Sequence, residues 1–254
     1  MNTKSLLPIL VFVLGRATPA QPQTSAQPQP QTPYQISVND PRPLWKAVRA
    51  LEERNGWQIS YEDRLYTGAD VVDSTAATYT GPGRSLLPRG GALQVSLSGS
   101  EPPATAVQML VDAWVHASPT TQFAARSIGG MVVVAPPQGS PLDLPISLPQ
   151  KQRDTNALLV DLAHAVGQAA SIQVLGPQLI NTQVQTSSAV TNQMARDVLL
   201  GALTAEAASD PRHPLFVWDF LCDGTGCALN VHAVRQRVPV PDGSSTKFVQ
   251  VSSQ

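Results

Sequence analysis

The two cysteines of the chain lie close together, in Cys222-Asp-Gly-Thr-Gly-Cys227. Neighbouring cysteines serve as a disulfide, a redox-active pair or part of a zinc site. Redox pairs are usually spaced C-x-x-C, and a zinc site would need further ligands, with His213 or His232 as candidates. Strand-forming runs flank the segment, and Asp223-Gly224 and Gly226 favour a turn. We therefore predict a β-hairpin joined by a disulfide at its strand ends, formed in an oxidising compartment.

The four histidines are scattered, and no two share the spacing of metal ligands on one element. The sequence contains no HExxH, no G-x-S-x-G, no phosphate-binding P-loop and no G-x-G-x-x-G after a strand. We therefore predict no catalytic residue, no metal and no cofactor. One alternative stays open: His164, His213 and His232 could converge in the cleft of an exported enzyme of unrecognised type that acts on cell-wall or extracellular polymer.

Two pairs of adjacent acids, Glu52-Glu53 and Glu62-Asp63, could supply proton-transfer groups. General acid–base catalysis needs carboxylates that face each other across a cleft, whereas adjacent carboxylates lie side by side. We interpret both pairs as solvated helix and turn surface.

Two tryptophans lie near the ends of one predicted helix, Trp45 at its start and Trp57 just after its end. Aromatic side chains are enriched in protein interfaces, so the pair is a candidate partner-binding surface. In so small a module, a tryptophan is more often part of the core. Exposed strand edges are a further candidate surface, because they accept a partner's strand.

The N-terminus has the pattern of a secretory signal peptide over residues 1–20. A short basic start with Lys4 precedes an apolar stretch from Ser5 to Gly15, and small residues come next, ending at Ala20. Residues 21–33 are rich in Gln and Pro and predict a disordered linker. No later segment is apolar enough to cross a membrane, so we expect an exported protein, periplasmic or extracellular.

Charge excludes some partners. Beyond the leader, 15 basic residues stand against 18 acidic ones, a net charge of about −3. That balance gives no electrostatic reason to expect binding to nucleic acid or to anionic lipid. We expect an envelope protein as partner.

The first half predicts the order strand, helix, strand, strand, helix, hairpin. Tyr34–Val38 alternates as a strand, and Asp40 is a candidate N-cap for a helix that ends at Asn55-Gly56. Trp57–Tyr61 and Ala92–Leu97 are the next strands. The two helices carry apolar stripes at helical spacing: Leu44, Ala47, Val48 and Leu51 in the first, and Val107, Leu110, Val111 and Trp114 in the second. Phe123–Ile128 and Met131–Val134 form a hairpin around Gly129-Gly130.

The second half repeats that order. Its predicted strands are Leu144–Leu148, Ser171–Leu175 and Gln183–Thr186, and the cysteine hairpin comes last. Asp154 and Thr191 are the expected N-caps of its two helices.

The sequence thus predicts an α+β protein of two small β-α-β modules in tandem. The first covers residues 34–135 and the second residues 142–238, with the best boundary at Ala135–Pro141. A tail over residues 239–254 carries a weak strand candidate at Lys247–Val251.

The segment from Tyr34 to Leu65 resembles the short N-terminal domain shared by secretins and TonB-dependent receptors. The matching residues are Ile36, Pro43-Leu44, Ala47, Leu51, Gly56, Ile59-Ser-Tyr61 and Leu65. The later half resembles the same unit more faintly, through Leu158, Leu162, Gly167, Ile172 and Leu179. The resemblance implies small envelope modules that work by protein–protein contact. We therefore expect a non-catalytic protein-binding or scaffold module, accessory to a secretin or outer-membrane transport complex.

Overall fold

The computed structural model describes residues 32–66, 68–73, 86–118, 122–177, 180, 182, 184–187, 189–240 and 245–252. The predicted leader and nearly all of the predicted linker lie outside these residues. The predicted α+β class is confirmed, with helices and short strands alternating along the chain. None of the helices described here combines the length and the apolar character needed to cross a membrane.

The first half pairs its strands in three ways. The β1 strand runs antiparallel to β5, β2 runs parallel to β7, and β6 and β7 form a hairpin. A small ribbon of β3 and β4 lies between β2 and β5 in sequence. The bounds are β1 (Tyr34–Asp40), α1 (Pro43–Asn55), β2 (Ile59–Glu62), β3 (Val71–Asp73), β4 (Leu86–Pro88), β5 (Gly91–Leu97), α2 (Pro103–Ala117), β6 (Ala124–Ile128) and β7 (Met131–Ala135).

The second half repeats the same pairings. The β8 strand runs antiparallel to β12, β10 runs parallel to β14, and β13 and β14 form a hairpin. A short pairing of β9 with β11 has no counterpart of the same kind among the described residues of the first half. The bounds are η1 (Pro141–Asp143), β8 (Pro145–Leu148), β9 (Arg153–Asp154), α3 (Thr155–Ala170), β10 (Val174–Leu175), β11 (Gln185–Thr186), β12 (Val190–Met194), α4 (Ala195–Ser209), β13 (Phe216–Cys222) and β14 (Cys227–Ala233).

Local sequence signals explain the end of α1 and the start of α3. The α1 helix ends at Gly56, whose φ of 69° suits glycine, and Asp154 caps α3 by accepting from the Ala157 amide at 2.7 Å. Two predicted caps are wrong. Asp40 instead accepts a hydrogen bond from the Arg42 amide in the turn before α1. Thr191 lies in β12, because that segment pairs with β8 and α4 begins only at Ala195.

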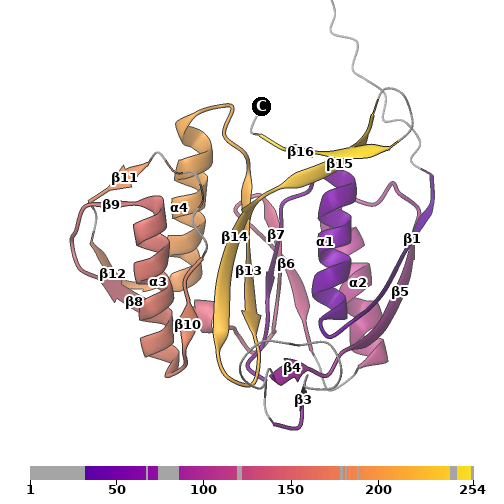
Figure 1. Cartoon of the computed structure of the whole chain (residues 1–254), viewed down its shortest axis with the longest axis horizontal. Coiled ribbons are helices and arrows are strands. Elements are labelled where there is room, and N and C mark those ends of the chain that lie inside the picture. Colours follow the sequence, from indigo (N-terminus) through magenta and orange to yellow (C-terminus); the bar gives the residue numbers. More distant parts are fainter. Residues whose placement is uncertain are drawn as a thin grey trace, which may run out of the picture. The chain divides into compact units, whose positions relative to one another are not determined.

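One six-stranded sheet, in the order β10-β14-β13-β2-β7-β6, contains strands from both halves (Figure 1). The halves meet where β13 runs parallel to β2, with Asp219 opposite Tyr61 and Phe220 opposite Glu62. We call this meeting of β2 and β13, with the side chains around it, the joint. The boundaries of the two modules remain predictions.

The two pairs of helices cover opposite faces of the sheet. Met131 and Val133 of β7 pack in a core with α3 and α4, whereas Val132 and Val134 pack in a second core with α1 and α2. Successive side chains of a strand point to opposite faces, so the cores lie on either side of the sheet. The joint therefore faces the first-half helices on one side and the second-half helices on the other.

The end of the chain forms an antiparallel ribbon of β15 (Arg235–Pro239) and β16 (Thr246–Gln250), seen beside α1 in Figure 1. The strand predicted at Lys247–Val251 is therefore present, one residue earlier. A side chain added at Gly56 would lie only 3.0 Å from the Val251 side chain. The C-terminal ribbon thus packs closely on the end of α1.

Candidate functional site

The carboxylate of Glu62 is fully buried at the joint, on the face covered by α4. Arg196 of α4 donates to both of its oxygens, at 2.8 Å from Nε and 2.6 Å from Nη2. The indole of Trp218 donates to it at 3.1 Å, and Ser140 donates through its hydroxyl. A bidentate guanidinium with two further donors satisfies the buried charge, as an ion in a low-dielectric interior requires.

Arg196 also pairs with Asp143, at the end of the segment that links the two halves. Burial alone would lower the pKa of Arg196, but its bonds to Glu62 and Asp143 outweigh burial and raise that pKa. Burial would likewise raise the pKa of Asp143, yet the bond from Arg196 and the Ser140 amide leave it lowered. Both groups are therefore held in their charged forms at neutral pH.

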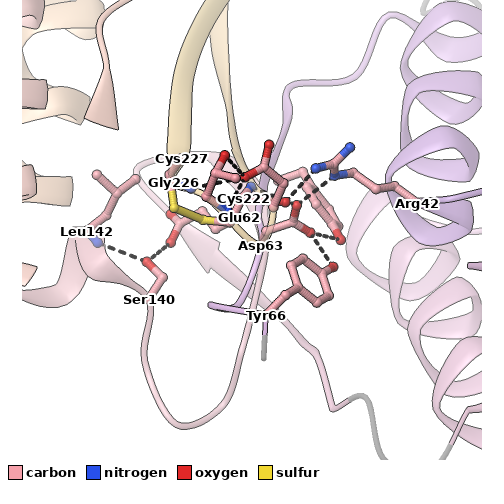
Figure 2. Close-up of a disulfide and its surroundings, with 12 residues drawn as sticks. Arg42, Glu62, Asp63, Tyr66, Ser140, Leu142, Cys222, Gly226 and Cys227 are labelled. Carbon is pink, nitrogen blue, oxygen red and sulfur yellow. Dashed lines mark hydrogen bonds and ion pairs between the residues drawn. A yellow bond between two sulfur atoms is a disulfide. The ribbon is translucent and has the colours of Figure 1, made fainter. Parts of the chain in front are cut away.

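The next carboxylate, Asp63, is also fully buried and sits among first-half side chains (Figure 2). Arg42 donates to it at 2.8 Å, and the hydroxyls of Tyr61 and Tyr66 donate at 2.8 and 2.9 Å. The amide of Cys222 donates at 3.0 Å. Burial raises the pKa of Asp63, and Arg42 opposes that rise. Burial and the nearby Asp63 charge raise the pKa of both tyrosines.

A third charged cluster crosses between the halves along α1. His232 of β14 lies 3.2 Å from the Glu52 carboxylate and 2.8 Å from the Arg49 guanidinium. Arg49 also approaches Asp219 of β13 at 3.6 Å. In the described part of the chain, the Nε of Arg49 and the Oδ1 of Asp219 are buried without a hydrogen bond.

The interpretation of both acid pairs as solvated surface is therefore wrong for Glu52, Glu62 and Asp63, which are all buried. Only Glu53 is partly exposed, where it pairs with Arg237 at 3.0 Å. The partner of Glu62 lies 134 residues further along the chain. No local spacing could have signalled that pair.

The two cysteines lie opposite each other at the ends of β13 and β14, with their sulfurs 2.07 Å apart. The predicted hairpin is present, and Asp223 closes its turn by accepting from the amides of Thr225 and Gly226. Because the sulfurs are bonded to each other, they are not free to ligate zinc. The Cys222 end of the hairpin lies against Asp63 (Figure 2).

The three histidines of the enzyme alternative sit in three separate sets of contacts. His164 is exposed on α3 beside Gln168, His213 lies against Glu206, and His232 belongs to the α1 cluster. Within the described residues, no group of three or more His, Cys, Asp or Glu side chains could hold a metal ion.

The two tryptophans of the candidate partner surface are both partly buried. Trp45 in α1 and Trp57 before β2 pack against the core of the first half. The Trp45 indole nitrogen is buried without a partner among the described residues. A partner surface at these tryptophans stays a prediction.

The sheet ends at two strands that pair on one side only, within the described part of the chain. The β6 strand has five residues and pairs only with β7, whereas β10 has two residues and pairs only with β14. Gly176 and Pro177 come directly after β10, and proline offers no amide to a further strand. The longer open edge is therefore that of β6.

Taken together, each of the three clusters makes at least one contact between the two halves of the chain. Each buried carboxylate of the joint has a basic partner within 4 Å, an arrangement that fixes geometry and does not resemble a pair of catalytic acids across a cleft. Comparison with protein-family models, curated proteins and solved structures gives no match to this chain.

Proposed function

We propose that the chain is an exported, non-catalytic binding or scaffold protein of the cell envelope, which takes up an extended segment of a partner protein at the open edge of β6. A secretin or other outer-membrane transport complex is the kind of assembly it would serve. Export rests on the leader pattern of residues 1–20, and the oxidised cysteine pair is compatible with it. The link to such complexes rests on the sequence resemblance.

The observation that carries the proposal is the joint itself. There, the sheet of the first half accepts β13 as an added parallel strand at β2. Strand addition is a common mode of peptide recognition, in which main-chain hydrogen bonds supply affinity. The first-half strands lie in the order β2, β7, β6, so β6 forms the edge opposite the joint. Its five residues are comparable with the four of β2.

The turn of the first hairpin defines which groups of β6 point outward. Gly129 and Gly130 both have positive φ, and Ile128 pairs with Met131 across this two-residue turn. In such a hairpin the closing pair is hydrogen bonded and pairs alternate from there. The amides of Ala125 and Ser127 therefore face away from β7, toward the open edge.

A proline at position 127 tests this geometry. Ser127→Pro removes an outward amide and leaves the hairpin ladder intact, as proline is tolerated on an edge strand. Ser127→Ala keeps the amide and serves as the matched control. Cross-linking recovery of envelope partners with the exported protein should fall at least about tenfold for Ser127→Pro, with Ser127→Ala equal to the natural protein. Equal recovery by two folded variants would disprove strand addition at β6.

A further inference from the structure

A cavity of about 170 Å³ lies at the carboxyl end of β2, beside the start of α1. Half of the buried side chains that line it are aromatic. Tyr61 and Phe123 stack there with their ring centres 5.6 Å apart. The buried side chains that line it are Pro43, Leu44, Tyr61, Pro88, Trp114 and Phe123.

Three guanidinium groups line the same cavity, those of Arg42, Arg64 and Arg89. Arg42 is paired with Asp63, as Figure 2 shows, and Arg64 is paired with Asp70 at 2.9 Å. Arg89 is exposed, and its side chain makes no ion pair or hydrogen bond with a described residue. Arg89 therefore brings to the cavity a positive charge that no carboxylate of the described residues pairs with.

One buried hydrogen-bond donor of the lining, the Nε of Arg64, has no partner among the described residues. The α1 helix begins here with no side-chain cap and no acidic residue in its first turn. The N-terminus of a helix carries partial positive charge. The carboxylate of Asp40 already accepts from the Arg42 amide at this helix start, so Arg89 is the main attraction for an anion.

We propose that this cavity binds a small carboxylic acid whose body is an aromatic or branched apolar group. The apolar group lies against Tyr61 and Phe123, and the carboxylate lies against the exposed Arg89. Guanidinium groups bind carboxylates through paired hydrogen bonds. A cavity of about 150 Å³ is large enough for benzene, so the apolar group has about that size.

Benzoate is the probe for this site, and benzamide is its uncharged counterpart of the same shape. Titration followed by amide NMR should give saturable binding of benzoate with a Kd on the order of 1 mM, ordinary for so small a ligand. Benzamide should bind at least about tenfold more weakly, because it lacks the charge. The shifted amides should include those of Leu44 and Tyr66, which line the cavity.

Variants separate the site from a general effect of charge. Arg89→Gln should weaken benzoate binding at least about fivefold without loss of folding, because Arg89 is exposed. Arg212→Gln removes an exposed arginine that pairs only with Asp210 among the described residues, and it should leave benzoate binding unchanged. No saturable binding of benzoate, equal binding of benzamide, or equal effects of both variants would overturn the proposal.

The same carboxylate chemistry could come from a free acid or from the C-terminal residue of a polypeptide. The peptide acetyl-Gly-Gly-Phe with a free carboxylate, compared with its C-terminal amide, distinguishes them. Binding at least about tenfold tighter than benzoate, lost in the amide, assigns the site to a polypeptide end. Binding no tighter than benzoate assigns it to a free acid. Neither result depends on the β6 edge, so Ser127→Pro should leave benzoate binding intact.

Discussion

The β2 and β10 strands occupy the same place in the two halves, yet one lies inside the sheet and the other at its edge. Each comes after the first helix of its half and runs parallel to the second strand of a hairpin. All four residues of β2 are buried, whereas Leu175 of β10 is 58% exposed. The residues directly after the two strands also differ. Asp63 after β2 accepts a hydrogen bond from the amide of Cys222, whereas Gly176-Pro177 follow β10.

The difference shows how one repeated unit can be made internal or terminal. The β2 strand, which must accept a neighbour, carries the buried acid Glu62, and its partner Arg196 lies on the neighbour's half. The β10 strand, which stays at an edge, is short and is followed by Gly176-Pro177. Buried ion pairs are costly to form and costly to break, so they favour one arrangement over others more than they add stability.

Removal of Arg196 should break the joint with the largest effect. Arg196→Met leaves Glu62 buried without its bidentate partner, and the free energy of unfolding should fall by about 3–5 kcal/mol. Urea denaturation measures the change. The double variant Glu62→Gln/Arg196→Met should recover part of the loss, because no buried charge then lacks a partner. A double variant as unstable as the sum of both single variants would contradict this role.

Removal of the disulfide at the end of β13 should have a smaller effect. Cys222→Ser/Cys227→Ser opens a short loop, and the free energy of unfolding should fall by about 2 kcal/mol. Reduction of the natural protein should reproduce that fall in urea denaturation, whereas the double variant should not respond to reductant. A stability unchanged by both treatments would show that the hydrogen bond from the Cys222 amide to Asp63 holds this end of β13 without the disulfide.

The pH dependence should distinguish the two faces of the joint. The pKa of Asp143 is lowered below its ordinary 3.8, so its pairing with Arg196 stabilises the fold above about pH 4 and is lost as pH falls through the lowered pKa. The raised pKa of Asp63 has the opposite sign, because the folded state takes up that proton more readily than the unfolded state.

Asp143→Asn tests this sign. At neutral pH the variant should be less stable than the natural protein by about 1 kcal/mol, as for a partly exposed ion pair. That difference should shrink toward zero as pH falls through the lowered pKa of Asp143, because the natural carboxylate is then protonated too. Thermal unfolding at a series of pH values measures both proteins. A difference that stays constant from neutral to acidic pH would show that Asp143 acts through shape alone.

Local patterns in the sequence were enough to predict the class of fold and most of its elements. Apolar stripes such as Leu44 to Leu51, the stop at Gly56 and the Gly129-Gly130 turn act within a few residues, so they can be interpreted without the fold. The joint could not be predicted in this way. The sequence indicates a solvated Glu62, because a carboxylate next to a second carboxylate is usually exposed. Only the pairing of β2 with β13 brings Arg196 to Glu62.

Truncation of Leu175 in β10 gives the smallest expected effect, and truncation of Ile59 in β2 gives the most direct comparison with it. Leu175→Ala should change the free energy of unfolding by less than about 0.5 kcal/mol, because the side chain is already exposed. Ile59→Ala, at a fully buried position of β2, should cost about 2–5 kcal/mol in the same urea denaturation. A loss above about 1 kcal/mol at Leu175 that grows with protein concentration would mean that a second copy covers β10, because only an associating protein gains stability with concentration. In that case β10 would be an edge strand only in the single chain, and in the assembled protein it would be covered as β2 is.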